Sequence, residues 1–331
     1  MFSNSGADTD VECLVRNGID FLKGSGCAHG KVILVGEHAV LYGHPAIAAP
    51  LTQLHTRVTV ERESAPKPSM VLGQQRATET VREPQTSLLD PKEICAALGL
   101  GESDLCVTID NSVPTGRGLG SSAAAGLALV RAIADFHGRS LARDEELQMV
   151  SLLEAQAHGR ASGVDAYAAS SSELMLFRDG RSQPQSVAPG CGAALVVVDS
   201  GLVSRTGQAV AGVAALLAAH RAPTTRTIDQ IGDVVRRSIT LLTMGEIDGL
   251  GAAFNENHLL LRELKLSTPE LERLVRAARD AGALGAKLTG GGRGGCVVAL
   301  ASSHVQAQMI GQRLVDAEGA LNYWVVGLAE T

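Results

Sequence analysis

The spacing of hydrophobic residues predicts strands and helices in both halves of the chain. An apolar run predicts a buried strand at 31–35, and apolar–polar alternation predicts a half-exposed strand at 54–61. Further strands are predicted at 105–110, 173–177, 193–199, 287–289, 296–300 and 323–328. Because these strands mix with helices without a strict strand–helix alternation, the pattern favours an α+β fold over a doubly wound sheet.

Helical spacing predicts an amphipathic helix at 11–22, an alanine-rich helix at 121–136 and a helix at 144–158, with Asp144 as its N-cap. The polar, proline-containing segment 62–91 is predicted to leave the sheet. The segment 179–190 is typical of a domain junction. We therefore expect two domains, at 1–188 and 189–331.

The composition narrows the class of protein. Hydrophobic residues make up 45% of the 331 residues and charged residues 19%, which is enough apolar material for a buried core. Aromatic residues are only 3%, so this core must be aliphatic. The net charge of −6 argues against non-specific binding of nucleic acid. An anionic ligand would have to be held by local donors.

The cysteines and the N-terminus bear on the compartment. None of the six cysteines forms a C-x-x-C pair, so we expect reduced, mostly buried thiols of an intracellular protein. The acidic N-terminus lacks the basic-then-apolar order of a signal peptide, and no apolar stretch approaches the ~18 residues of a membrane span. These features predict a cytoplasmic protein without a membrane partner.

The chain has 37 glycines, and three short segments are especially rich in them. The segment 114–123 (PTGRGLGSSA) directly precedes the alanine-rich helix, so its backbone N–H groups and the helix N-terminus predict a phosphate site. It satisfies G-x-G-x-x-A, but the first-strand context and the later acidic residue of a dinucleotide fold are missing. Glycines that serve tight packing alone remain an alternative.

Two other glycine-rich segments fail the motifs that they superficially match. The segment 287–296 (KLTGGGRGGC) contains G-x-G-x-x-G, but a strand follows it where a dinucleotide fold needs a helix. The segment 24–31 has the wrong glycine spacing for a P-loop, and Val32 stands where Ser or Thr would bind magnesium.

In their order along the chain, the segments 31–48, 114–123 and 287–296 resemble the GHMP kinase superfamily of galacto-, homoserine, mevalonate and phosphomevalonate kinases. The first segment (KVILVGEHAVLYGHPAIA) is similar to the mevalonate kinases, whereas galactokinases would show Gly-Glu-His-Thr-Asp there. The resemblance implies an N-terminal domain like ribosomal S5 domain 2 and a C-terminal α/β sandwich domain. It also implies phosphorylation of the 5-hydroxyl of (R)-mevalonate by ATP, in isoprenoid and sterol precursor synthesis.

The resemblance assigns a role to individual residues. Asp165 would accept or orient the proton of the acceptor hydroxyl, and Lys31 would stabilise the charge that develops there. Ser122 and Glu154 would hold Mg²⁺. Contacts to ATP are expected from the phosphate loop, namely from Pro114, Gly116, Arg117, Gly118, Leu119, Gly120, Ser121 and Ser122. Contacts to mevalonate are expected from Lys31, Glu37, His38, Asp165, Thr289 and Gly290.

Several alternatives stay open at this stage. Glu37 and His38 also suit a packed strand-to-loop corner, and Arg293 either reaches a phosphate or points to water. The chain also fits a phosphomevalonate or homoserine kinase, although the segment 31–48 has no basic residue besides Lys31 for a second phosphate. A non-catalytic nucleotide-binding relative would lack Asp165 or Lys31, and both are present. An RNA-binding module is disfavoured by the charge, and a monomer or homodimer is expected.

Overall fold

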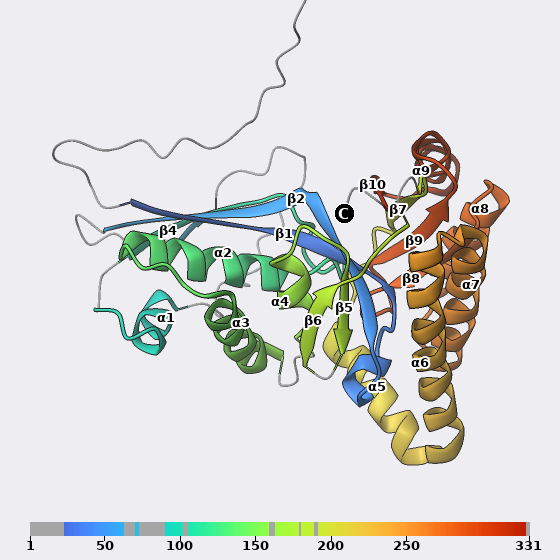
Figure 1. Ribbon diagram of the computed structural model, residues 1–331, viewed down its shortest axis with the longest axis horizontal. Helices are drawn as coiled ribbons and strands as arrows, with labels where there is room; N and C mark the ends of the chain where they lie inside the picture. Colours follow the sequence, from blue (N-terminus) through green and yellow to red (C-terminus); the bar gives the residue numbers. More distant parts are fainter. Residues whose placement is uncertain are drawn as a thin grey trace, which may run out of the picture.

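The chain forms two β-sheets, each covered by helices (Figure 1). The computed structural model describes residues 23–62, 70–72, 90–101, 105–158, 163–178, 180–188 and 191–328, with the side chains of 70–72 and 154–158 left aside. The predicted helix at 11–22 and most of the segment 62–91 lie outside the described residues. The mixed helix and sheet content confirms the α+β class.

The first sheet is built around the long strand β2 (Ala46–Arg62), and its main order is β3-β4-β2-β5-β6. The strand β1 (Lys23–Val35) pairs antiparallel with one edge of β2, while β4 and β5 share the opposite edge. The remaining strands are β3 (Met70–Leu72), β4 (Leu105–Asn111), β5 (Met175–Arg178) and β6 (Arg181–Pro184). Among these described pairs only β3 and β4 run parallel.

Helices α1 (Pro91–Ala97), α2 (Ser121–Phe136), α3 (Arg143–His158) and α4 (Val164–Ala169) lie on one side of the first sheet (Figure 1). The helix α2 packs closely on β1 because a glycine faces it: a Cβ on Gly26 would lie 2.0 Å from the carbonyl oxygen of Ala128. The small residues of α2 and β1 therefore set a short distance between helix and sheet, and this places the N-terminus of α2 beside the end of β1.

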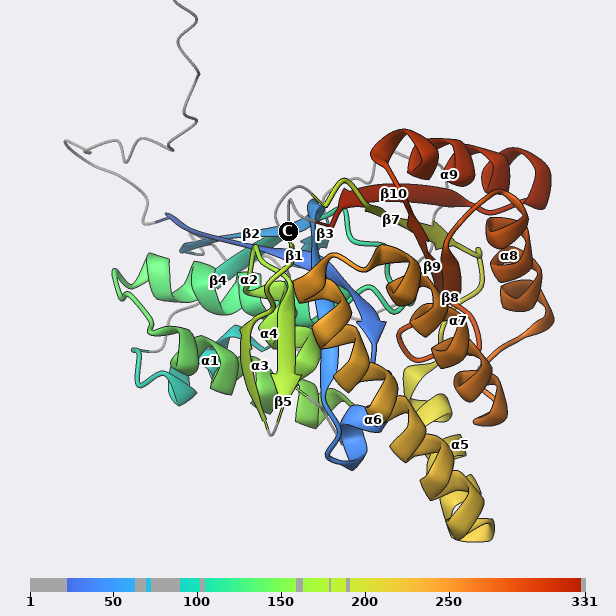
Figure 2. The same cartoon turned by 45° about the vertical axis from the view of Figure 1, so that its right-hand side comes forward.

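The second sheet has the order β10-β7-β9-β8 and is antiparallel throughout. Its strands are β7 (Ala194–Asp199), β8 (Gly285–Thr289), β9 (Cys296–Ala301) and β10 (Asn322–Gly327). Every residue of β7, β8 and β9 is buried, which agrees with the continuous apolar runs there. Figure 2 shows the helices on this side, which are α5 (Thr206–Ala219), α6 (Arg221–Met244), α7 (Ile247–Glu263), α8 (Pro269–Asp280) and α9 (His304–Glu318).

Most predicted elements are confirmed, and α2 has the predicted bounds. The N-cap prediction is wrong: α3 begins at Arg143, so Asp144 lies in its first turn, where an acidic side chain also favours the helix. The strand β2 begins eight residues before the predicted segment, because Pro50 and the alanines around it carry little strand signal. The segment 179–190 contains β6, which pairs with β5 in the first sheet. The domain boundary at 188 remains a prediction.

The cysteines only partly follow the expectation. All five that the structure describes are free, but only Cys95 and Cys296 are buried, while Cys27 is exposed. The prediction of mostly buried thiols is therefore wrong for the described residues. Cys27 is exposed because β1 turns its alternate side chains away from α2. Within the same residues, no helix combines the length and the apolar character needed to cross a bilayer.

Candidate functional site

The two residues predicted to be catalytic meet although 134 positions separate them. Lys31 lies on β1, and Asp165 lies in the first turn of α4, which Gly163 starts with a φ of 80°. The Lys31 Nζ atom lies 2.9 Å from Asp165 Oδ1 and donates to the carbonyl of Gly118 over 3.1 Å. The lysine side chain is 2% exposed and the aspartate side chain 37% exposed. The carboxylate therefore stays open to a ligand while its cation is covered.

The predicted phosphate loop lies directly over this lysine. The Lys31 N–H donates to the carbonyl of Leu119 over 2.9 Å, and a Cβ on Gly120 would lie 3.0 Å from Lys31 Cγ. Gly120 has a φ of 77° and precedes α2 without a side-chain cap. The first N–H groups of α2 are thus free of a capping side chain and suit an anion.

Asn111, which the sequence analysis did not single out, orders the start of this loop. Its amide nitrogen donates to the Ser121 hydroxyl over 3.2 Å and to the Val113 carbonyl over 3.1 Å. Its amide oxygen accepts from the Thr56 hydroxyl over 2.7 Å. The pattern N-S-V-P just after a strand was the available signal, because Asn at a strand end favours such local bonds.

The second glycine loop interlocks with the phosphate loop. Gly290, between β8 and β9, lies so close to Gly118 that a Cβ on Gly290 would be 3.0 Å from the Gly118 oxygen. Thr289 anchors the loop to β1: its hydroxyl donates to the Ile33 carbonyl over 2.9 Å and accepts from the Ile33 N–H over 3.2 Å. Thr289 and Gly290, two of the six residues predicted to contact mevalonate, therefore lie at the contact between the sheets.

The loop after β7 also holds both glycine loops, and the sequence analysis missed it. The Ser204 N–H donates to the Gly116 carbonyl over 2.7 Å, and its hydroxyl donates to the Gly292 carbonyl over 3.0 Å. Arg117, predicted to contact ATP, points its Nε to the buried Asp199 at 3.0 Å. Arg117 thus braces the phosphate loop against the second sheet.

His38 has a defined tautomer. Its Nε2 lies 2.9 Å from the Gly291 carbonyl, so Nε2 carries the proton and Nδ1 is a lone-pair acceptor. That Nδ1 atom is buried without a hydrogen-bond partner among the described residues. Burial lowers the pKa of His38, so the neutral ring is the form at pH 7. The backbone of His38 has a φ of 60°, which is uncommon for a residue other than glycine.

Glu37 has two partners from the second half of the chain. Its carboxylate forms an ion pair with Lys287 of β8 and accepts from the Asn257 amide of α7 over 3.0 Å. The side chains of Glu37 and Lys287 are 0% exposed. The sequence analysis missed Lys287 and Asn257, although a lysine within a short buried strand is itself an unusual signal.

The predicted magnesium ligands are only partly described. Ser122 stands in the first turn of α2, and its side chain is exposed and has no bond to another described residue, so its hydroxyl is free to coordinate. Glu154 lies on α3, but its side chain is outside the described ones. Among the described side chains, no three metal-ligating groups come together. The pair Ser122 and Glu154 therefore stays a prediction.

Arg293 is exposed, which agrees with a side chain that points to water, while a contact with a phosphate stays a prediction. Its Nε donates to the Lys265 carbonyl over 3.3 Å, and its guanidinium packs against Gly212 of α5. The side chain thus extends across the surface of the second half, where helix backbone and carbonyl groups contact it.

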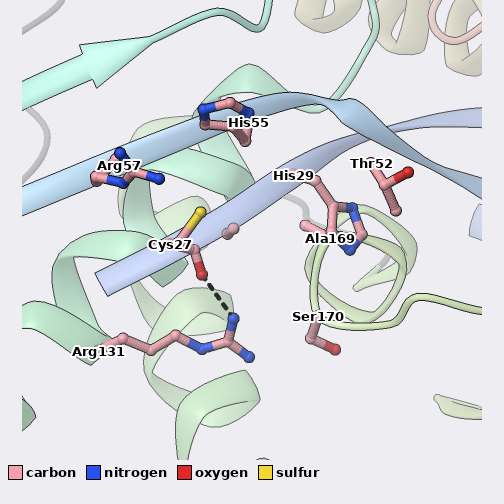
Figure 3. A pocket seen from close by; sticks show the side chains of 9 residues that line it. Cys27, His29, Thr52, His55, Arg57, Arg131, Ala169 and Ser170 are labelled. Atoms are coloured by element: carbon pink, nitrogen blue, oxygen red, sulfur yellow. Dashed lines mark hydrogen bonds between the residues drawn. The ribbon is translucent and has the colours of Figure 1, made fainter. Parts of the chain in front are cut away.

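A groove of about 240 Å³ lies beside the outer part of β1, and Figure 3 shows the side chains around it. Arg131 of α2 donates to the Cys27 carbonyl over 2.8 Å and so joins this helix to β1 beside the groove. None of the predicted site residues lines this groove, which is formed by Cys27, Ala28, His29, Thr52, His55, Arg57, Arg131, Ala169 and Ser170. We do not assign it to the catalytic centre.

Two family models match the chain in the order that the motifs predicted. The GHMP kinases N terminal domain matches residues 91–173, and the GHMP kinases C terminal model matches residues 238–320. Together with the relatives below, these matches show that the chain belongs to the GHMP kinase family.

Within this family, the chain is similar to proteins named mevalonate kinase. The chain is 34% identical to the mevalonate kinase of Aeropyrum pernix, over 82% of this chain and 87% of that protein. It superposes with a TM-score of 0.79 on the crystal structure of L. major mevalonate kinase in complex with R-mevalonate, at 30% identity over 92% of this chain and 96% of that one. Streptococcus pneumoniae phosphomevalonate kinase shares the fold, with a TM-score of 0.73 over 91% and 99% of the two chains, but only 19% identity.

Proposed function

We propose that this chain is a kinase that transfers the γ-phosphoryl group of ATP to the 5-hydroxyl of (R)-mevalonate. The observation that carries the proposal is the pair of Lys31 and Asp165 beneath the phosphate loop. Relatives named mevalonate kinase, at 30% identity or more over most of the chain, support the choice of acceptor.

The reaction forms a bond between the acceptor oxygen and the γ-phosphorus and breaks the bond to the oxygen that bridges the β- and γ-phosphates. The acceptor proton passes to Asp165, whose carboxylate is open on one side, and ADP leaves. Lys31 stabilises negative charge on the attacking oxygen and on the transferred group. The N-terminus of α2 binds the phosphates, while Mg²⁺, when bound by Ser122 and Glu154, would neutralise their charge.

The tautomer of His38 adds a condition on the acceptor. A neutral ring whose Nδ1 is an acceptor binds a hydroxyl, which can donate, in preference to a carboxylate, which cannot. In this proposal His38 therefore contacts a hydroxyl of mevalonate, and the substrate carboxylate binds elsewhere. The cytoplasm as compartment and a monomer or homodimer as assembly remain predictions.

The test is ADP release with Mg·ATP and, in turn, mevalonate, phosphomevalonate, homoserine or galactose. Turnover with mevalonate alone is expected, and it should collapse in Asp165→Asn and in Lys31→Met. Matched controls are Lys23→Met, on the exposed part of the same strand, and Asp110→Asn on β4, both of which should keep activity. Turnover with a different alcohol would overturn the acceptor. ATP binding without any turnover would favour a non-catalytic relative.

A further inference from the structure

The buried ion pair between Lys287 and Glu37 joins the two sheets directly beside His38. Lys287 belongs to β8 of the second sheet, and Glu37 lies two residues after the end of β1 in the first. The Lys287 Nζ atom also lies 3.5 Å from the Ile33 carbonyl of β1. The second carboxylate oxygen of Glu37 accepts from Asn257 of α7. Both carboxylate oxygens are therefore engaged by the second half of the chain.

Stability alone is a poor explanation for a pair in this place. Desolvating two ions costs several kcal/mol each, and apolar residues of similar volume often stabilise a core equally well. Burial lowers the pKa of Lys287, Glu37 opposes that effect, and the charge of Lys31 adds to it. The contact with Glu37 thus holds Lys287 near the like charge of Lys31. A pair that pays for its own desolvation in this way does more to fix the position of Glu37 than to stabilise the core.

The residue after Glu37 shows what this position controls. His38 has the left-handed φ of 60°, and a strained residue of this kind persists only when its neighbours are held firmly. The second half of the chain holds it on both sides, through Lys287 at Glu37 and through the Gly291 carbonyl at the ring itself. The unpartnered Nδ1 of His38 depends on both contacts for its direction.

We propose that Lys287 is a positioning residue for the acceptor alcohol: through its ion pair with Glu37 it fixes the backbone of His38 and thereby the direction of the free imidazole nitrogen. The proposal rests on the proposed function, because it assumes that the acceptor binds beside His38. It assigns no contact between Lys287 and the substrate.

The experiment is steady-state kinetics of Lys287→Met with both substrates varied. A positioning role predicts that the KM for mevalonate rises by about 10- to 100-fold, since small displacements of a positioning group have effects of this size. The KM for ATP should stay within about twofold, because the phosphate loop keeps its own contacts. Equal changes in both KM values, or no change in either, would overturn the proposal.

Two further variants separate positioning from stability. Lys287→Met combined with Glu37→Gln removes both buried charges, so the thermal midpoint should recover while the mevalonate KM remains raised. If the thermal midpoint and the mevalonate KM both return to their wild-type values, the pair only stabilises the fold. Arg279→Met is the matched control, since Arg279 contacts β8 at the Ala286 carbonyl but has no contact with Glu37. It should lower stability without a selective rise in the mevalonate KM.

The wild-type acceptor panel distinguishes this proposal from the proposed function. If the wild type uses another alcohol, the proposed function fails, and the same split between KM values is then measured with that alcohol. A selective rise in its KM would still support the positioning role of Lys287, and an unselective one would contradict it.

Discussion

Two lysine–carboxylate pairs lie at the contact between the sheets, and they differ in how they meet solvent. The open pair, Lys31 and Asp165, leaves the carboxylate 37% exposed. The sealed pair, Lys287 and Glu37, has both side chains at 0%. A group that exchanges a proton with a ligand must be reachable, whereas a group that holds a backbone segment need not be. A lysine paired with a carboxylate thus suits chemistry in one place and positioning in the other.

The largest expected effect comes from breaking the open pair. Asp165→Asn should lower kcat by about 10²- to 10⁴-fold, because the amide cannot take the acceptor proton. The free energy of unfolding should fall by about 1–3 kcal/mol, less than for the sealed pair, because the covered Lys31 loses its anionic partner but keeps the Gly118 carbonyl as an acceptor. Steady-state ADP release and urea unfolding measure the two quantities. An unchanged kcat would remove Asp165 from the chemistry.

Breaking the sealed pair should affect the free energy of unfolding more, and kcat less, than breaking the open pair does. Lys287→Met leaves a buried carboxylate without its cation and should lower the free energy of unfolding by about 3–5 kcal/mol. The double variant with Glu37→Gln should regain most of that loss. Urea unfolding curves of the wild type and the two variants test this, and a single variant as stable as the wild type would show that the carboxylate finds another partner.

Acid should weaken the contact between α7 and β8 next to the sealed pair. His258 on α7 accepts from the Leu288 N–H of β8 over 3.3 Å, and burial lowers its pKa from 6.5 to about 4. The unfolded state therefore binds the proton first, and stability falls as the pH drops from 6.5 to about 4, by up to about 3 kcal/mol. Unfolding free energies across that range should show a flatter slope in His258→Asn, which keeps an acceptor for Leu288 but does not titrate. An identical slope would exclude His258 as the source.

The smallest expected effect concerns the loop above the open pair. Asn111→Ala removes the bonds to Ser121 and Val113, each worth about 1 kcal/mol. The KM for ATP should rise several-fold while the KM for mevalonate stays near its wild-type value. Kinetics with each substrate varied measure this split. A rise confined to the KM for mevalonate would mean that Asn111 supports binding of the acceptor and not of the nucleotide.

Much of the fold and part of the site could be predicted from the chain alone. The helix at 121–136 has the predicted bounds because its alanine-rich composition and the glycines before it act locally. Lys31 and Asp165 were found through motifs, and the structure brings them together. The roles of the predicted ATP, mevalonate and magnesium residues remain predictions, and Glu154 lies outside the described side chains.

The missed residues share a physical cause. Lys287, Asn257 and Ser204 gain their importance from partners at least 88 positions away in the chain. No local period or spacing in the sequence predicts such a partner, because the bond forms only when two separate segments are buried together. The same reason explains His38, whose tautomer depends on the Gly291 carbonyl in the second half of the chain.

By itself, the sequence determined the elements, the glycine loops and the family to which the motifs point, since these follow from short-range hydrogen bonding and hydrophobic periodicity. Only the tertiary structure decided which lysine meets which carboxylate and how much water reaches each pair. That choice depends on desolvation, and desolvation is a property of the assembled core that surrounds a charge, not of the residues next to it in the chain.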